Sequence, residues 1–253
     1  MNLFSLAYSG VYYFITIFLP IFSVIYYYCR PLIFSLLWPT VSDDVDKGLS
    51  AEKSLLFSPT SSQHHGGEIK GTVLEIGAGT GSNIKYYNAA IINKLYLNEP
   101  CERMHQKLLE SAHKKFDLSN ITILSGGAET LSSVPTASVD VVVCTLVLCS
   151  VNNQKHVLQE VLRVLKPMGR FFFMEHIAAK AGTKLRRKQN FWEPIWQCLP
   201  LDGCSLNCET DGTICQTTGF EKLGELKYFM DNNGPKIAAP TVSGVVVATK
   251  TRK

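Results

Sequence analysis

One segment constrains the fold of this chain more than any other. The apolar run at residues 73–76 leads directly into a turn with glycine at 77, 79 and 81, and the start of a helix follows. Glycine permits positive φ and lets the backbone approach a ligand closely, and a helix start offers free N–H groups. The order G-x-G-x-G matches neither a phosphate-binding P-loop nor the usual dinucleotide turn. The segment therefore predicts a strand and a tight turn that hold a nucleotide-like ligand.

A carboxylate ends the next predicted strand. Residues 94–98 have a strand pattern, and Glu99 follows them before Pro100 opens a helix. Glu99 stands about 20 residues after the glycine turn, the distance at which a strand–helix–strand unit places a carboxylate on a ribose diol. NAD and S-adenosylmethionine both fit these two features, so at this point the cofactor stays open.

Strand and helix patterns alternate through the rest of the chain. Helices are expected after Pro100 and at 154–165, and an irregular helical region at 184–198. This alternation predicts an α/β fold with a parallel sheet and helices on both faces. The strands are expected at 72–76, 94–98, 121–124, 139–144, 170–174, 224–229 and 242–250.

Further motifs stand at the expected strand ends. Ser-Gly-Gly-Ala-Glu occupies 125–129, Asp-Val-Val-Val-Cys begins at 140, and Arg-Val-Leu-Lys-Pro-Met-Gly occupies 163–169. With Leu-Glu-Ile-Gly-Ala-Gly-Thr-Gly and Glu99, this ordered set resembles the class I methyltransferases that use S-adenosylmethionine, over residues 70 to 176. The resemblance implies a Rossmann-like sheet with an antiparallel last strand and S-adenosylmethionine as cofactor. The expected cofactor-binding residues are Glu75, Gly77, Ala78, Gly79, Gly81, Asn83, Glu99, Pro100, Ala128, Glu129, Thr145 and Leu146.

A closer resemblance rests on motifs further along the chain. Cys-Thr-Leu-Val-Leu-Cys-Ser-Val at 144–151, Phe-Met-Glu-His at 173–176, Glu-Pro-Ile-Trp at 193–196 and Asp-Gly-Cys at 202–204 are similar to the membrane-anchored thiol methyltransferases. With the apolar N-terminus, this resemblance to the methyltransferase-like protein seven family covers nearly the whole chain. It implies that small lipophilic thiols are the acceptors. The chain departs from the family pattern at Ala78, Glu99, Met168 and residues 207–210.

Methylation of a thiol requires removal of its proton. A thiol of pKa about 8.5 is mostly protonated at neutral pH, and a histidine of pKa about 6.5 can act as the base. His176 follows the fifth strand at the edge where open α/β folds bind their ligands, so we expect it to be catalytic. Its alternative is a structural, hydrogen-bonded role. Asp202 is a second catalytic candidate through the family match, and its alternative is a turn residue before Gly203.

The eight cysteines predict neither disulfides nor a metal centre. Cys198, Cys204, Cys208 and Cys215 are close in sequence, but no C-x-x-C pair or histidine partner gives the usual zinc spacing. We therefore expect no metal. Cys144 and Cys149 are expected to line the end of a strand as small apolar residues.

The N-terminus predicts a membrane anchor at residues 1–38. Residues 3–29 carry no charged side chain, which exceeds the ~20 residues needed to cross a bilayer, and nothing resembles a cleavage site. Arg30 after the run predicts that the catalytic domain faces the cytosol. The family resemblance implies the endoplasmic reticulum or lipid droplets as its location. Pro20 and Pro31 leave open a hairpin or interfacial insertion, and a buried core helix is a further alternative. A linker and helical region is expected at 39–69 and one methyltransferase domain at 70–253.

The charge of the chain limits the kinds of partner that it is expected to bind. A net charge of +4 is modest, and the basic run at 184–188 suits a solvated helix face or anionic headgroups better than nucleic acid, which we do not expect as a partner. Two other functions stay open: methylation of a lipid or quinone precursor, and a cofactor-binding membrane or lipid-droplet protein without turnover. We also expect that deleting residues 1–38 leaves cofactor binding intact.

Overall fold

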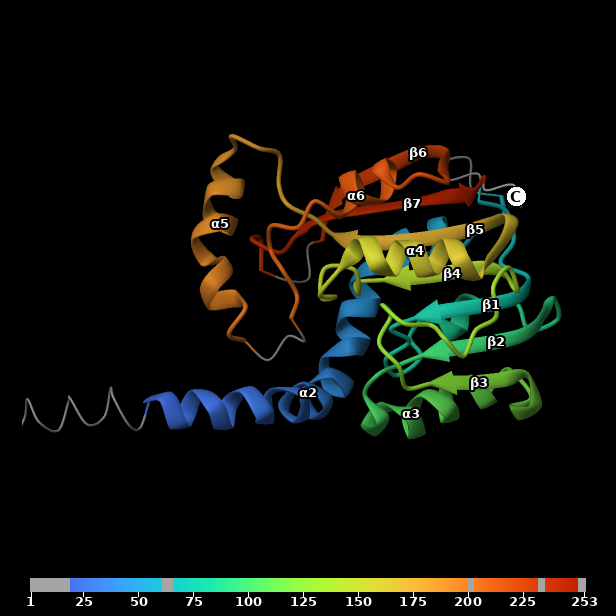
Figure 1. The fold of residues 1–253 in the computed structure, drawn as a ribbon, viewed down its shortest axis with the longest axis horizontal. Coiled ribbons are helices and arrows are strands. Elements are labelled where there is room, and N and C mark those ends of the chain that lie inside the picture. Colours follow the sequence, from blue (N-terminus) through green and yellow to red (C-terminus); the bar gives the residue numbers. More distant parts are fainter. Residues whose placement is uncertain (1–18, 61–65, 200–202, 232–234, 250–253) are drawn as a thin grey trace, which may run out of the picture.

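The protein is described by a computed structural model that covers residues 19–60, 66–199, 203–231 and 235–249. In these ranges seven strands form one sheet in the order β3-β2-β1-β4-β5-β7-β6 (Figure 1). β1 to β5 run parallel and β7 is antiparallel to both of its neighbours, which confirms the predicted sheet. The strands are β1 (Gly71–Ile76), β2 (Ile92–Asn98), β3 (Ile121–Leu124), β4 (Val139–Thr145), β5 (Leu165–His176), β6 (Phe220–Met230) and β7 (Pro240–Ala248). The α-helices are α2 (Leu19–Leu56), α3 (Glu102–His113), α4 (Gln154–Val164), α5 (Lys184–Trp196) and α6 (Thr210–Gln216).

Helices cover both faces of the sheet because successive strand residues point to opposite sides. Leu74 of β1 lies in a core cluster with residues of α4 and α6. Its neighbour Val73 lies in a second cluster with residues of α2 and α3. The helix predicted after Pro100 is α3, and its apolar side faces the core, where Met104 and Leu108 are at most 1% exposed.

β5 is longer than predicted. Leu165 pairs with Val139 and Arg170 pairs with Val141, so residues 166–169 bulge from the ladder instead of ending it. Met168, at φ +63°, occupies the left-handed region there. The Pro-Met-Gly sequence looks like a turn locally, and only the pairing with β4 shows that the strand continues through it.

The first described helix differs most from expectation. α2 runs without interruption across the predicted boundary at residue 38, where a linker and helical region was expected to begin. Its first half projects away from the sheet and its second half lies against it (Figure 1). The second half is held by the buried side chains of Leu49 and Leu56 and by a buried ion pair of 2.8 Å between Lys53 and Asp46. Among the described residues, no helix has the length and apolarity needed to span a bilayer.

Candidate functional site

The glycine turn lies at the carboxyl end of β1. Gly77, Gly79 and Gly81 have φ of +65°, +56° and +90°, a region that residues with a Cβ rarely adopt. A Cβ on Gly77 would stand 2.2 Å from Cγ2 of Val147. The N–H of Ala78 donates to the carbonyl of Asn98 at 3.0 Å, which ties the turn to the end of β2. The sequence therefore folds here into a turn that residues other than glycine would disrupt.

Glu99 joins this turn to the next strand end. One carboxylate oxygen accepts from the N–H of Gly79 and the other from the N–H of Cys101, each at 2.8 Å. Glu99 is 7% exposed, whereas Pro100 beside it is exposed. Two backbone N–H groups thus hold this carboxylate beside the glycine turn, where a strand–helix–strand unit would bring it to a ribose diol.

A second buried carboxylate lies under the turn. Glu75 accepts from Nδ2 of Asn83 at 2.9 Å and from the hydroxyl of Tyr87 at 2.7 Å, and burial raises its pKa to about 7. The same Nδ2 of Asn83 also donates to Thr145 at 2.9 Å. Oδ1 of Asn83 is buried and has no hydrogen-bond partner among the described residues. A free acceptor beside a carboxylate fits the ammonium group of an amino-acid moiety such as that of S-adenosylmethionine.

The ends of β3 and β4 complete the cofactor end. Asn98, which was not among the predicted site residues, donates from Nδ2 to the carbonyl of Gly126 at 2.6 Å and so holds the loop before Ala128. Glu129 accepts from the N–H of Asn152 at 3.0 Å, and Ala128 is buried. Leu146 has φ +58° and donates its N–H to the carbonyl of Met174 at 2.8 Å. The predicted cofactor residues thus follow the parallel strands β1 to β4 at one edge of the sheet.

Helix α2 covers this end of the site. A Cβ on Gly79 would come within 3.1 Å of the indole nitrogen of Trp38, and Oγ of Ser42 lies 3.4 Å from Oγ1 of Thr80. The ring of Phe34 stacks on Trp38 with centroids 5.4 Å apart. Trp38 therefore lies beside the glycine turn, and the expectation that the cofactor site does not depend on residues 1–38 stays a prediction.

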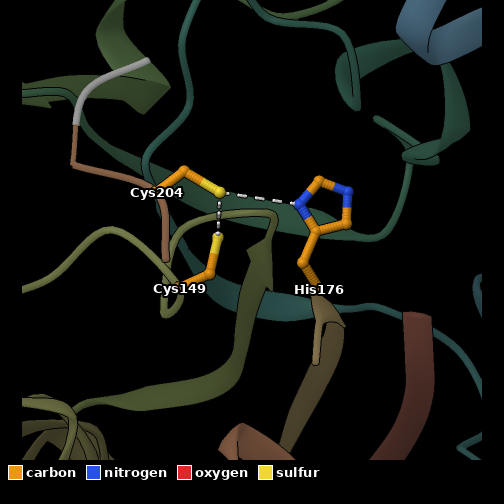
Figure 2. Close-up of side chains that lie close together, drawn as sticks. All are labelled: Cys149, His176 and Cys204. Carbon is orange, nitrogen blue, oxygen red and sulfur yellow. Dashed lines mark hydrogen bonds between the residues drawn. The ribbon is translucent and has the colours of Figure 1, made fainter. Parts of the chain in front are cut away.

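His176, the predicted catalytic residue, ends β5 and lies beside two cysteines (Figure 2). Sγ of Cys204 is 3.6 Å from Sγ of Cys149 and 3.8 Å from Nδ1 of His176. Cys149 is buried, and the other two are partly exposed. This Cys149–His176–Cys204 cluster brings together residues that are far apart in the chain.

The three groups of this cluster influence one another's protonation. The contact with Cys149, and next that with the His176 imidazole, lower the pKa of Cys204 to about 5 against the effect of burial. The contact with Cys204, together with burial, raises the pKa of Cys149 well above its ordinary value. Burial lowers the pKa of His176, but Cys204 and Glu175 outweigh it and the net shift is upward. The cluster thus favours a Cys204 thiolate beside a His176 imidazolium.

Sequence reasoning missed much of this end of the site. Cys149 was expected to be a small apolar lining residue, and no histidine stands at the usual zinc spacing from Cys204 along the chain. The fold nevertheless places both cysteines beside His176. Glu175 was also not selected, although it is fully buried, accepts from the thiol of Cys144 at 3.3 Å and has its pKa raised by burial to about 7. Asp202 lies outside the described residues.

Comparisons with known proteins agree with this geometry. Residues 74–173 match the family described as "Methyltransferase domain". The chain is 35% identical over 199 residues to "Thiol S-methyltransferase TMT1A" of Homo sapiens, covering 79% of each protein. It is 36% identical over 182 residues to "Thiol S-methyltransferase TMT1B" of Rattus norvegicus, covering 70% of this chain and 71% of the relative.

Solved structures share the fold. The [4+2]-cyclase SpnF has a TM-score of 0.58 at 14% identity, over 78% of this chain and 80% of its own. A S-adenosylmethionine-dependent methyltransferase of Thermotoga maritima, described as a possible histamine N-methyltransferase, has a TM-score of 0.52 at 19% identity, over 86% of this chain and 100% of its own. At such low identity these likenesses describe the architecture alone.

Proposed function

This chain belongs to the class I S-adenosylmethionine-dependent methyltransferases, in the family of the thiol S-methyltransferases, and from that premise we propose that it S-methylates small lipophilic thiols at a membrane surface. The observation that carries the thiol assignment is the Cys149–His176–Cys204 cluster, which gives the acceptor end of the site sulfur and imidazole groups. Such a set suits a soft nucleophile that must lose a proton before it reacts.

At the cofactor end, the protein's contribution is position. S-adenosylmethionine supplies, when bound, a methyl group that its sulfonium sulfur already activates. We assign the ribose diol to Glu99 and the ammonium group to Glu75 and Asn83, and the hydrogen bonds of these residues around the glycine turn support the assignment. Fixing the methyl donor in this way turns a bimolecular encounter into an oriented one, which is a large part of catalysis for a reaction of this kind.

At the acceptor end, the protein must deal with a proton. The Cys204 thiolate favours the charged form of His176, so we assign proton uptake to the Cys204–His176 pair and not to His176 alone. The assignment of His176 as the general base stays a prediction, now in the form that His176 acts together with Cys204. Asp202 stays a prediction as well.

Helix α5 supports the membrane part of the proposal because its polarity is the reverse of that of an ordinary surface helix. Its outward side chains Phe191, Trp192 and Ile195 are 71%, 45% and 53% exposed. Lys184, Arg187 and Lys188, also exposed, lie on the same side at helical spacing. Apolar and aromatic side chains beside basic ones fit a bilayer that contains anionic headgroups.

The inward side of α5 is polar and tied to the domain. Gln189 is fully buried and accepts from the N–H of Ala179 at 2.7 Å. Glu193 accepts from the hydroxyl of Ser205 at 2.8 Å and from the N–H of Leu206 at 2.7 Å. These hydrogen bonds fix the orientation of α5. They therefore keep its apolar side chains on the outward side, away from the core of the domain.

The projecting half of α2 continues the same surface. The hydroxyl of Tyr26 donates to the carbonyl of Cys198, just after α5. Both α5 and this half of α2 lie beyond the same end of the sheet, toward which β1 to β5 point (Figure 1). Val24, Ile25 and Leu36 on α2 are 56%, 54% and 64% exposed. We propose that this side rests on the membrane, with the uncharged N-terminal run as the anchor and the catalytic domain on the cytosolic side.

A methyl-transfer assay tests the thiol assignment. The full-length protein would be incubated with labelled S-adenosylmethionine and matched thiol, hydroxyl and amine acceptors of equal lipophilicity. We expect labelled product from the thiols alone. Labelling of a hydroxyl or quinol acceptor in place of the thiol would favour the lipid or quinone alternative, and cofactor binding without any product would favour a protein without turnover.

Quenching of tryptophan fluorescence by brominated lipids tests the membrane surface on the full-length protein. We expect quenching in vesicles of phosphatidylcholine with phosphatidylserine, and loss of a large part of it in Trp192→Phe. Trp196→Phe is the matched control, because Trp196 lies on the same helix but its indole nitrogen is buried. Equal quenching in wild type and Trp192→Phe would show that α5 does not contact the bilayer.

A further inference from the structure

We propose that Cys149, His176 and Cys204 bind a Zn²⁺ ion whose fourth ligand is the sulfur of the acceptor thiol. The proposal rests on the proposed thiol acceptor and assigns to the cluster a role that the spacing of these residues along the chain did not predict. It replaces proton uptake by the Cys204–His176 pair with activation of the thiol by the metal.

The distances in the cluster match the edges of a zinc tetrahedron. Zn–S bonds of about 2.3 Å and Zn–N bonds of about 2.0 Å, at tetrahedral angles, separate two ligand atoms by roughly 3.5 to 3.8 Å. The observed separations are 3.6 Å between the two sulfur atoms and 3.8 Å between Cys204 Sγ and His176 Nδ1. All three ligand atoms lie within 4.8 Å of one another and point toward a common centre (Figure 2). The third edge, between Cys149 and His176, is at most 4.8 Å long and would have to shorten around an ion.

The backbone holds the ligands in place before any ion binds. His176 is the last residue of β5 and pairs with Thr241 of β7. The N–H of Ser205, next to Cys204, donates to the carbonyl of Cys149 at 2.8 Å. The segments that carry two of the three ligands are thus joined by a backbone hydrogen bond, and the third ligand stands in the sheet. Such preorganisation lowers the entropy cost of binding a metal.

The donor set selects the metal. Two thiolates and an imidazole are soft and borderline ligands that suit Zn²⁺ and do not suit Mg²⁺ or Ca²⁺, which prefer oxygen. Three protein ligands with one open position are typical of catalytic zinc, whereas structural sites have four protein ligands. Cys208 is near in sequence, but its sulfur faces the carbonyl oxygens of His176 and Ser205 at 3.6 Å and 3.7 Å. The fourth position is therefore left for the acceptor.

The metal would do the work of a base in the transfer. The acceptor R–SH loses its proton to solvent when its sulfur binds Zn²⁺, because the ion stabilises the thiolate. A lone pair of that sulfur then forms the bond to the methyl carbon, and the bond from this carbon to the cofactor sulfur breaks with its electron pair left on the cofactor. The product is a neutral thioether, which binds zinc more weakly than a thiolate and can leave. No oxidant or reductant is needed.

Metal content is the first test. The full-length protein, kept reduced and loaded with Zn²⁺, should retain one equivalent after gel filtration. Loss of an outer-shell partner alone weakens zinc binding about 10- to 100-fold, so Cys149→Ser, Cys204→Ser and His176→Ala should each weaken it at least that much. Cys208→Ser is the matched control and should keep the ion. Wild-type protein without zinc, or equal loss in Cys208→Ser, would overturn the three-ligand site, and unchanged binding of S-adenosylmethionine shows that each variant is folded.

Cobalt substitution tests the open position without relying on turnover. The Co²⁺ protein should show sulfur-to-metal charge-transfer absorption, and a lipophilic thiol added without cofactor should change that spectrum as it becomes the fourth ligand. A spectrum that does not respond to the thiol would overturn acceptor binding at the metal. Methylation of thiols at an unchanged rate after complete removal of zinc would also overturn the proposal, yet leave the thiol methyltransferase assignment standing. A thiol-responsive metal site without methylation would instead contradict the assignment of the activity.

Discussion

The cofactor end and the acceptor end of the site are built in different ways. At the cofactor end, each group stands within a few residues of the end of one of the parallel strands β1 to β4, and hydrogen bonds such as that from Gly79 to Glu99 join neighbouring loops. At the acceptor end, Cys149, His176 and Cys204 come from three segments separated by α4, β5 and α5. The strand order of the sheet therefore positions the residues of the cofactor end. The residues of the acceptor end meet only because the segments after β4 and after α5 pack beside the end of β5.

This difference separates two kinds of constraint. The cofactor end needs glycines at positive φ and a carboxylate at a fixed distance, so it leaves a local pattern in the sequence. The acceptor end needs only that three side chains meet, and a cysteine or histidine in a loop carries no local pattern of that meeting. If the two ends are independent, substitutions should affect either cofactor affinity or turnover, and seldom both.

The largest expected effect comes from the acceptor end. His176→Ala should lower thiol-methylating turnover by roughly 10²-fold or more, with little change in the affinity for S-adenosylmethionine. Thiols that are already ionised at the assay pH should recover much of the loss, because they need neither a base nor a metal to remove a proton. His156→Ala, on the exposed side of α4, is the control and should be silent. An equal deficit for all thiols would mean that His176 orients the acceptor or supports the fold.

The limits of prediction from the sequence follow the same division. The strand at 121–124 was predicted to the residue, and β1, β2 and β4 to within two residues at either end, because their apolar runs are bounded by turns. The glycine turn, Glu75, Asn83 and Glu99 could be predicted as cofactor-site residues because their spacing and the strand ends fix their positions. The cluster of Cys149 and Cys204 with His176 could not be predicted, since it depends on the backbone hydrogen bond between the segments that carry the two cysteines.

The position of Trp38 shows another limit of prediction from the sequence. Its position at the end of an apolar run made it part of an anchor, and no pattern in the sequence shows that a helix turns back onto the glycine turn. Pro31 and Pro39 lie inside α2 and mark residues that can bend a helix, but they do not give the direction of the bend. The direction of the bend depends on tertiary contacts.

The second prediction tests the burial of Glu75 through the pH dependence of stability. The folded pKa is about 7 and the ordinary value is 4.5, so the folded protein holds this proton more tightly than the unfolded chain. Its contribution is fully present below about pH 4.5 and is lost as pH rises toward 7, by about 3 kcal/mol. Urea unfolding across this range should show a smaller fall in unfolding free energy for Glu75→Gln than for wild type. Glu68→Gln, an exposed control, should keep the wild-type slope, and an unchanged slope in Glu75→Gln would place the titration elsewhere.

The third prediction addresses the affinity of the cofactor end alone. Glu99→Ala removes hydrogen bonds to a charged group, at about 1.5 to 3 kcal/mol, and should weaken S-adenosylmethionine binding tenfold or more in calorimetry. Turnover at saturating cofactor should fall much less than in His176→Ala. Glu110→Ala, on the exposed side of α3, controls for the loss of a negative charge. Unchanged affinity in a folded Glu99→Ala protein would show that the ribose is held by other groups.

The smallest expected effect tests whether cofactor binding depends on a residue of α2 as well as on the strand ends of the sheet. Trp38→Ala should weaken S-adenosylmethionine binding roughly fivefold, because about 1 kcal/mol of contact is lost where the indole covers Gly79. The neighbouring Leu37, 49% exposed, gives the matched control, and Leu37→Ala should bind the cofactor normally. Trp38→Ala should leave membrane association unchanged, since the uncharged run and the outward side of α5 are intact. If calorimetry shows equal affinities for the two variants, α2 merely passes the glycine turn. If only Trp38→Ala weakens binding, the helix that leads to the proposed anchor also forms part of the cofactor site, and a change in how α2 sits on the membrane would alter cofactor affinity.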